Sequence, residues 1–207
     1  MVEEPSDVNP FTTHDNVVRR YVLPFTHDTL LDSDPTTGAL RGAIAVAFEP
    51  SDDGKACRFT LREGVCFADG SPVTMADVLF GWELAESGHV PMGFVADAFR
   101  RIAAVEVEDE RHFTVVFRDV HYAAVQAVGE SWIVAKRQFF VDRVAELAAR
   151  AAVPAPEVGS ALFGQLLGKI DHECGPGTGP YVLHNRPEGP SSWRKRQDLL
   201  LSRNEHC

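Results

Sequence analysis

Residues 59–78 read FTLREGVCFADGSPVTMADV, and this stretch combines a strand, tight turns and the start of a helix. Polar and apolar side chains alternate over residues 58–62, which predicts a half-buried strand. Gly64 and the DGSP sequence at 69–72 predict turns, because glycine permits positive φ and proline presets φ. The stretch therefore predicts a strand that is followed closely by a helix.

The helix is predicted over residues 75–87. The hydroxyl of Thr74 can accept a hydrogen bond from a free N-terminal amide, and Asp77 places negative charge in the first turn. Gly88 predicts the C-terminal end. Apolar residues at spacings of three and four predict the face that packs inward: Met75, Val78, Leu79, Trp82 and Ala85.

Toward the C-terminus, further strands and a helix are predicted. Residues 105–107 and 113–117 flank a polar EDER sequence and predict a hairpin. Apolar residues at helical spacing predict a helix over 138–152. Residues 181–183 and 199–201 predict two strands joined by a long polar loop. The order of these elements predicts a mixed α/β chain.

Toward the N-terminus, the chain mixes turn formers with short apolar runs. Residues 21–25 (YVLPF) predict a short strand or a loop that carries a proline. Turns are predicted at 34–38 (DPTTG) and 51–54 (SDDG), because proline and glycine set the required φ angles.

The composition is that of a globular protein with one large or two small domains: 207 residues, 44% hydrophobic and 24% charged. A net charge of −10 argues against non-specific binding to nucleic acid or anionic lipid, which would be repelled. Charged residues, glycine or proline interrupt every apolar run before the roughly 18 residues that a membrane span needs. The start, MVEEPSD, lacks a secretory signal, so the protein is either cytosolic or has lost its leader.

The four cysteines contain no C-x-x-C pair and leave the compartment open. Two disulfides come into consideration, Cys57 with Cys66 across a turn-containing stretch and Cys174 with Cys207.

Several short patterns have chemical precedents but lack an essential part. The glycine-rich stretch 175–179 lacks the Gly-Lys-Ser/Thr ending of a phosphate-binding loop. Ser-x-x-Lys at 192–195 lies in a polar insert, and Asp-x-Asp at 32–34 lacks the glutamate of a calcium loop. His-Glu-Cys at 172–174 lacks the Pro-Cys-x-x-Cys partner of zinc deaminases. We therefore predict no catalytic residue, no metal and no cofactor.

Taken as a whole, residues 59–78 resemble a signature of the bacterial extracellular solute-binding proteins of family five, F-x-L-R-x-G-V-x-F-x-D-G-x-P-x-T-A-x-D-V. These are the oligopeptide-, dipeptide- and nickel-binding components of ABC importers. Other segments resemble the family in the same order: VNP at 8–10, DTLL at 28–31, GTGPY at 177–181 and RN at 203–204. The resemblance spans nearly the whole chain.

The chain also departs from the family. Ala47 and Phe48 replace a usual serine and tryptophan, Cys66 replaces a polar or basic residue, and Cys207 stands where a tyrosine is expected. Family members are considerably longer, and everything after the Arg-Asn motif is missing here. The chain thus looks like an N-terminal fragment.

The resemblance implies a fold: the first lobe of a periplasmic binding protein-like α/β structure (type II, similar to cluster C), with mixed sheets and without the second lobe. The two lobes of such proteins close on a ligand by hinge motion. The first lobe is expected to divide into a larger discontinuous subdomain, residues 1–40 and 127–207, and an inserted α/β subdomain, residues 41–126.

The resemblance also implies ligand-binding residues. Asp28, Thr29 and Leu30 are expected to line the cleft, where an extended peptide adds main-chain hydrogen bonds to an exposed strand edge. The Asp28 carboxylate could receive the peptide's ammonium group. Phe94 and Tyr181 are further candidates. The signature itself is expected to be mainly architectural, with the Trp82 face packed inward.

The implied function is a binding protein rather than an enzyme. It would capture an oligopeptide or another small solute outside the cytoplasm, as a monomer in the periplasm or on a lipid anchor, and deliver it to the permease subunits of an ABC importer. One alternative is the ligand-sensing domain of an intracellular, sugar-responsive transcriptional regulator, fused to a separate DNA-binding module. A hydrolase is disfavoured because no nucleophile and base pair emerges from the sequence.

Overall fold

The computed structural model describes residues 7–93, 95–121, 123–183 and 201–206. The first half contains α1 (Asn16–Tyr21), α2 (Leu23–Thr26), β1 (Leu31–Ser33), β2 (Leu40–Gly42), β3 (Ala45–Pro50), β4 (Ala56–Leu61), α3 (Met75–Ser87) and α4 (Ala96–Phe99). The second half contains β5 (Ile102–Val107), β6 (His112–Phe117), α5 (Ala124–Ser131), α6 (Arg137–Arg150), α7 (Ala161–Leu167), β7 (Tyr181–Leu183) and β8 (Leu201–Arg203).

The largest sheet has four antiparallel strands in the order β3-β4-β6-β5. Side chains in β4 and β6 alternate between the core and the outer face, and Phe59 stacks on Phe113 with ring centroids 5.3 Å apart. The strand predicted at 58–62 and the hairpin predicted around 105–117 are therefore confirmed. The alternation of polar and apolar residues was sufficient to predict these strands, because one face of the sheet is solvated.

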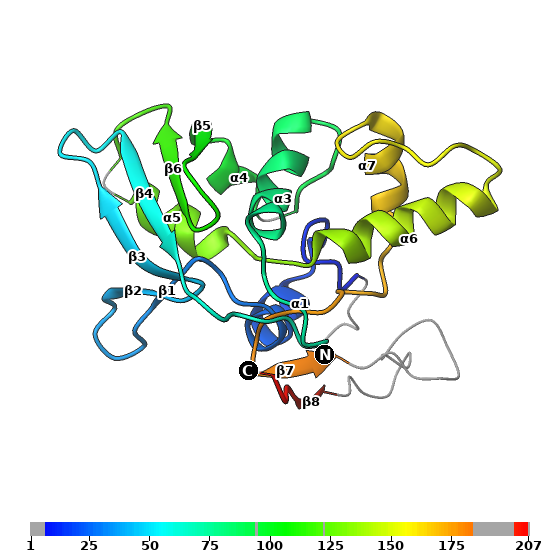
Figure 1. Ribbon diagram of the computed structural model, residues 1–207, viewed down its shortest axis with the longest axis horizontal. Helices are drawn as coiled ribbons and strands as arrows, with labels where there is room; N and C mark the ends of the chain where they lie inside the picture. Colours follow the sequence, from blue (N-terminus) through cyan, green and yellow to red (C-terminus); the bar gives the residue numbers. More distant parts are fainter. Residues whose placement is uncertain (1–6, 94, 122, 184–200, 207) are drawn as a thin grey trace.

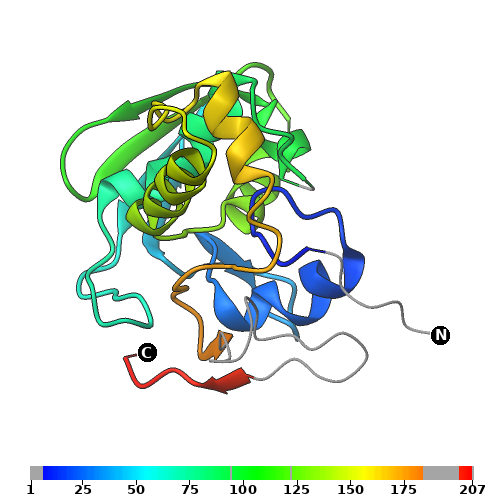
Figure 2. The same ribbon diagram turned by 90° about the vertical axis from the view of Figure 1, so that its right-hand side faces the viewer.

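The four-stranded sheet lies at one end of the molecule and helices α6 and α7 at the other, with α3 between them (Figure 1). Two smaller antiparallel sheets, β1-β2 and β7-β8, complete the structure. A quarter turn shows α1 and α2, in blue, between the β7-β8 hairpin and helices α6 and α7 (Figure 2).

Helix α3 has the predicted limits. Thr74 and Asp77 form a reciprocal capping box, and Gly88 ends the helix at φ 68°. The predicted inward face is confirmed in part, because Val78 is fully buried and the other four residues of that face are partly buried against the core. Phe80 and Leu84 are fully buried, whereas Trp82 is only partly buried. Helix α3 is covered on more than one side, so its apolar residues extend around it and their spacing does not indicate the most buried stripe.

Residues 21–25 form helices rather than the predicted strand or loop. Asp15 caps α1 by accepting hydrogen bonds from the amides of Val17 and Val18. Pro24 lies in the first turn of α2, where its missing N–H costs no hydrogen bond. The proline was a helix-start signal, not a sign of an edge strand.

The predicted C-terminal hairpin is present, with Tyr181 opposite Arg203 and Leu183 opposite Leu201, but β8 overlaps the strand predicted at 199–201 only at Leu201. Residues 184–200, which include the predicted polar loop and the first two residues of the predicted second strand, lie outside the described residues. Helix α6 stops at Arg150, two residues before the predicted end, and Ala152 follows it with φ 55°.

Cys57, Cys66 and Cys174 are free thiols, so the expected Cys57–Cys66 bridge is wrong. Strand β4 pairs with β3 and β6 rather than with the segment that contains Cys66. Cys57 faces the buried side of the sheet. Cys174 is not bridged either, and Cys207 lies outside the described residues.

Trp132 connects the sheet, helix α3 and the N-terminal segment. Its indole Nε1 donates a hydrogen bond of 2.6 Å to the carbonyl oxygen of Val78 in α3. Its ring lies 5.1 Å from Phe99 and 5.8 Å from Phe113, between centroids. The side chain is fully buried.

None of the helices within the described ranges is long and apolar enough to cross a membrane.

Candidate functional site

Segments that are far apart in sequence meet around residues 26–28. Thr178 Oγ1 accepts a hydrogen bond of 2.9 Å from the Asp28 amide. The Gly179 amide donates to the Thr26 carbonyl (3.0 Å), and the Gly177 carbonyl accepts from the Ala68 amide (2.9 Å). The loop at 175–180 thus joins the DTLL segment to the turn of the 59–78 signature.

The Arg-Asn segment closes this junction from the C-terminal side. Asn204 is buried. Its side-chain Nδ2 donates a hydrogen bond to the Gly179 carbonyl oxygen (2.9 Å), and its backbone amide donates one to the Pro180 carbonyl oxygen (2.8 Å). Position 177 requires glycine because the backbone of Thr26 approaches it closely. A Cβ at this position would lie 1.8 Å from the Thr26 carbonyl oxygen.

A cavity of about 430 Å³ opens beside this junction, and we call it the acidic cleft. It is lined by Arg19, Leu23, Pro24, His27, Asp28, Thr29, Leu31, Asp32, Ala43, Glu130, Ser131 and Ile133. Asp28, Asp32 and Glu130 outnumber Arg19, so the lining favours a cationic group.

Burial raises the pKa of Asp28 above its usual value, and the charge of Asp32 acts in the same direction, although a hydrogen bond from Thr178 opposes both. Asp32 is exposed and pairs with Arg41 at 2.6 Å. The Glu130 carboxylate accepts a hydrogen bond from the Ser33 hydroxyl. Asp28 is therefore the carboxylate whose charge a bound cation would stabilise most.

His27 is part of the lining of the acidic cleft and is almost fully buried. Its Nε2 lies 3.0 Å from the Cys174 carbonyl oxygen, and its Nδ1 lies 3.0 Å from Thr26 Oγ1. A carbonyl only accepts, so Nε2 carries the proton and Nδ1 accepts from the hydroxyl. Burial lowers the pKa of His27 to about 4, which keeps the ring neutral at pH 7.

The backbone around residues 28–30 is paired within the chain on both sides. The Leu30 amide donates to the Trp132 carbonyl and the Val134 amide donates to the Asp28 carbonyl. On the other side, Ile44 donates to Thr29, and Ala45 donates to Leu30. The exposed strand edge that was expected here is thus occupied by residues 43–45, which lead into β3.

The predicted ligand-binding residues are distributed as follows. Asp28 and Thr29 line the acidic cleft. Leu30 is fully buried in the core, and Tyr181 is exposed outside the cleft, where its ring contacts Phe25 edge-on at 6.1 Å. Phe94 lies outside the described residues.

Sequence reasoning did not assign four charged or titratable residues to the cleft: Arg19, His27, Asp32 and Glu130. His27 and Asp32 flank the DTLL segment, so proximity to that motif was an available signal. Glu130 lies in α5, about a hundred residues later, and no motif marks it.

Within the described residues, no group of three or more His, Cys, Asp or Glu side chains is arranged to hold a metal ion.

Comparison with known proteins gives one family. The model of the "Bacterial extracellular solute-binding proteins, family 5 Middle" matches residues 39–206. Over 116 residues the chain is 32% identical to the "Probable peptide-binding protein YejA" of Agrobacterium fabrum. The matched region is 55% of this chain and 18% of that protein. Over 112 residues the chain is 31% identical to the "Probable D,D-dipeptide-binding periplasmic protein DdpA" of Escherichia coli. The matched region is 52% of this chain and 21% of that protein.

Among solved structures, the oligopeptide-binding protein AppA from Bacillus subtilis, in complex with a nonapeptide, matches all of this chain with a TM-score of 0.73 and 16% identity. The chain covers 36% of AppA. This likeness confirms the predicted α/β fold, that of the periplasmic binding proteins, over about a third of their length.

Proposed function

Because this chain belongs to the bacterial extracellular solute-binding proteins of family 5, we propose that it forms one wall of a receptor that captures a peptide or a related small solute. The observation that supports this is the acidic cleft, which the family-like segments at 28–31 and 177–181 build together. The receptor would act outside the cytoplasm as a monomer and deliver its ligand to an ABC permease. Lipid anchoring remains a prediction.

The ligand group that we assign to the cleft is an ammonium, such as the N-terminus of a peptide. Asp28 lines the cavity and is partly desolvated, so a hydrogen-bonded cation would stabilise its ionised form. The paired backbone of residues 28–30 leaves recognition to side chains rather than to strand addition.

The organisation of the chain follows the same reasoning. All four strands of the large sheet come from residues 45–117. We propose that residues 41–126 form the inserted subdomain and that the remainder, which carries most of the acidic cleft, forms the discontinuous one.

The two rival functions have less support. The family and the neighbours named above are binding proteins, which argues against a hydrolase. None of the relatives named above points to the ligand-sensing domain of a transcriptional regulator.

The test is an NMR titration of the 207-residue chain with trialanine and with N-acetyl-trialanine. We expect weak, saturable binding of trialanine, because one wall desolvates a ligand only partly, and little binding of the acetylated peptide, which has no ammonium. Asp28→Asn should weaken trialanine binding about tenfold, as expected for loss of a charged hydrogen bond.

Asp52→Asn, in the exposed turn between β3 and β4, is the matched control and changes the net charge equally. Equal affinity for the two peptides, or equal effects of the two substitutions, would overturn the assignment of an ammonium to Asp28. The absence of binding by either peptide would overturn the receptor function of this wall.

A further inference from the structure

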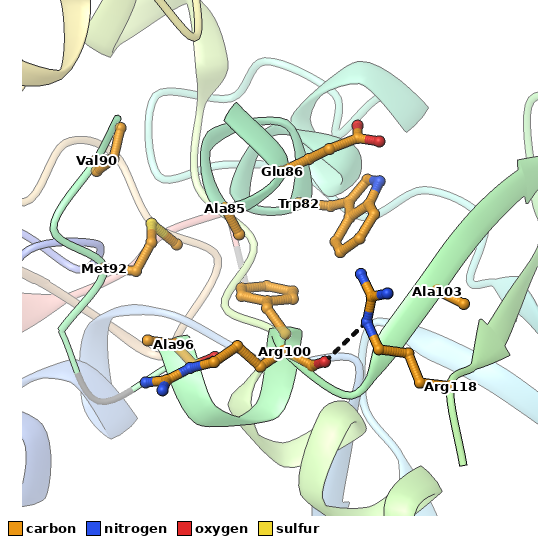
Figure 3. Close-up of a pocket in the computed structure, with 10 residues that line it drawn as sticks. Trp82, Ala85, Glu86, Val90, Met92, Ala96, Arg100, Ala103 and Arg118 are labelled. Carbon is orange, nitrogen blue, oxygen red and sulfur yellow. Dashed lines mark hydrogen bonds between the residues drawn. The ribbon is translucent and has the colours of Figure 1, made fainter. Parts of the chain in front are cut away.

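A second cavity, of about 470 Å³, lies between α3, α4 and the end of β6, and we call it the arginine pocket (Figure 3). It is lined by Trp82, Ala85, Glu86, Val90, Met92, Ala96, Phe99, Arg100, Ala103 and Arg118. None of these residues lines the acidic cleft. The arginine pocket therefore requires its own explanation.

The walls of the arginine pocket are mainly apolar. The rings of Trp82 and Phe99 lie 6.3 Å apart between centroids, at an angle of 53°. Val90 and Met92, from the loop after α3, form the opposite wall. Phe99 is held from behind by the edge-on contact with Trp132. A preformed apolar cavity of this volume has the size of a small-molecule site.

Arg118 supplies a polar group at this apolar surface. Its Nε donates a hydrogen bond of 3.1 Å to the Arg100 carbonyl oxygen, drawn as a dashed line in Figure 3. The guanidinium points toward Trp82 (Figure 3). In the described part of the chain, its two terminal nitrogens form no hydrogen bond or ion pair, so both remain available to an anion.

The other charged groups of the lining do not prevent an anion from binding to Arg118. Arg100 is already paired with the Asp97 carboxylate at 2.7 Å on an exposed surface. Glu86 is the single acidic group in the lining, and in Figure 3 its carboxylate lies on the other side of the Trp82 ring from Arg118. Two guanidiniums and one carboxylate line this cavity in a chain with a net charge of −10. Because Asp97 neutralises Arg100, the lining is close to neutral, and Arg118 is the guanidinium that faces the cavity without an acidic partner among the described residues.

From this geometry we propose that the arginine pocket binds a small amphipathic carboxylate. An aromatic or branched apolar group packs against Trp82, Phe99 and Met92, and the carboxylate accepts two hydrogen bonds from the terminal nitrogens of Arg118. Burial of the apolar group provides most of the affinity, and the arginine selects for negative charge. This proposal does not depend on the ligand assigned to the acidic cleft.

The test uses indole-3-acetate as the probe, with the neutral indole-3-acetamide for comparison. NMR spectra of the full chain follow the side-chain indole N–H of Trp82, which Trp82→Phe identifies. We expect saturable shifts of this signal with the acetate and about tenfold weaker binding of the acetamide, as for loss of a charge-assisted hydrogen-bond pair.

Arg118→Gln should reduce acetate affinity to that of the acetamide, and Arg118→Lys should restore only part of it, because lysine keeps the charge but not the bidentate geometry. Arg101→Gln is the matched control, since Arg101 is exposed, carries the same charge and does not line the pocket. Thermal unfolding establishes that each variant is folded.

Three outcomes would overturn the proposal: acetamide binding as well as acetate, equal losses for Arg118→Gln and Arg101→Gln, or no saturable change at Trp82. Each differs from a failure of the trialanine titration, which monitors the acidic cleft.

Discussion

The acidic cleft and the arginine pocket have similar volumes, about 430 and 470 Å³, but differently charged linings. Three carboxylates and one guanidinium face the first, whereas two guanidiniums and one carboxylate face the second. Size alone therefore does not separate the ligands of the two cavities. The charged group that we assign to the ligand does, because Asp28 predicts an ammonium in one cavity and Arg118 a carboxylate in the other.

The two cavities also differ in how the chain builds them. Residues 82–118 provide the whole arginine pocket, whereas the acidic cleft depends on segments around residues 27, 130 and 178. A single residue supports both. Trp132 accepts a hydrogen bond from the Leu30 amide beside the cleft and packs against Phe99 in the pocket.

The largest expected effect follows from removing that shared support. Trp132→Ala should destabilise the protein by about 3–5 kcal/mol, because it leaves a cavity in the core, and should weaken binding at both sites. Urea unfolding and the two titrations measure these effects. Trp132→Phe keeps an aromatic ring and loses the hydrogen bond to Val78, so a cost of about 1–2 kcal/mol is expected. If Trp132→Ala impaired only one site, the idea of a shared support would be wrong.

Gly177→Ala should separate the two cavities. A Cβ at this position lies 1.8 Å from the Thr26 carbonyl oxygen, so the loop must move away from the cleft. We expect a loss of about 3 kcal/mol in stability and loss of trialanine binding, with indole-3-acetate binding unchanged. Gly168→Ala is the control, because its nearest neighbour would lie 3.6 Å away. Loss of both activities would show that the cavities are not built independently.

The pH dependence of stability offers a readout specific to the cleft. The pKa of His27 is lowered from 6.5 to about 4, so between these values the unfolded chain binds the proton more readily than the folded one. Stability should therefore fall as the pH falls through this range, by as much as about 3 kcal/mol. The pKa of Asp7 is raised to about 6 by burial and acts in the opposite direction.

The measurement that isolates His27 is the difference in unfolding free energy between the wild type and His27→Gln, followed from pH 7 to pH 4. The wild type should lose more stability than the variant over this range, because glutamine does not titrate. Parallel curves would mean that His27 is not buried as described.

The smallest expected effect lies away from both cavities. Ala152 follows helix α6 in a left-handed conformation, with φ 55°, and the Val153 amide bonds to the Ala148 carbonyl around it. Ala152→Gly should stabilise the protein by about 0.5–1 kcal/mol, because glycine adopts this conformation without strain. Calorimetry measures the gain, and both titrations should be unchanged. A loss of stability would contradict the strain at this position.

Much of the fold could be predicted from local patterns. The capping box at Thr74 and Asp77, the alternation in β4 and the GTGPY motif each carry their structural signal within a few residues. Residues 21–25 were predicted incorrectly because the same proline suits either a helix start or an edge strand. The most buried positions of α3, Phe80 and Leu84, were not predicted, because a helix covered on several sides lacks a polar stripe to mark its orientation.

The candidate sites were predicted less completely. Asp28 and Thr29 were identified through their motif and do line the cleft, whereas Glu130 and Arg118 carry no local signal. The amino-acid sequence by itself determined the family, the capped helix, the hairpins and the acidic net charge, because each depends on neighbouring residues or on simple sums. Only the tertiary structure decided where a positive group meets an apolar cavity, because the Arg118 guanidinium becomes a binding group only when packing brings it there and leaves its two terminal nitrogens without a partner among the described residues.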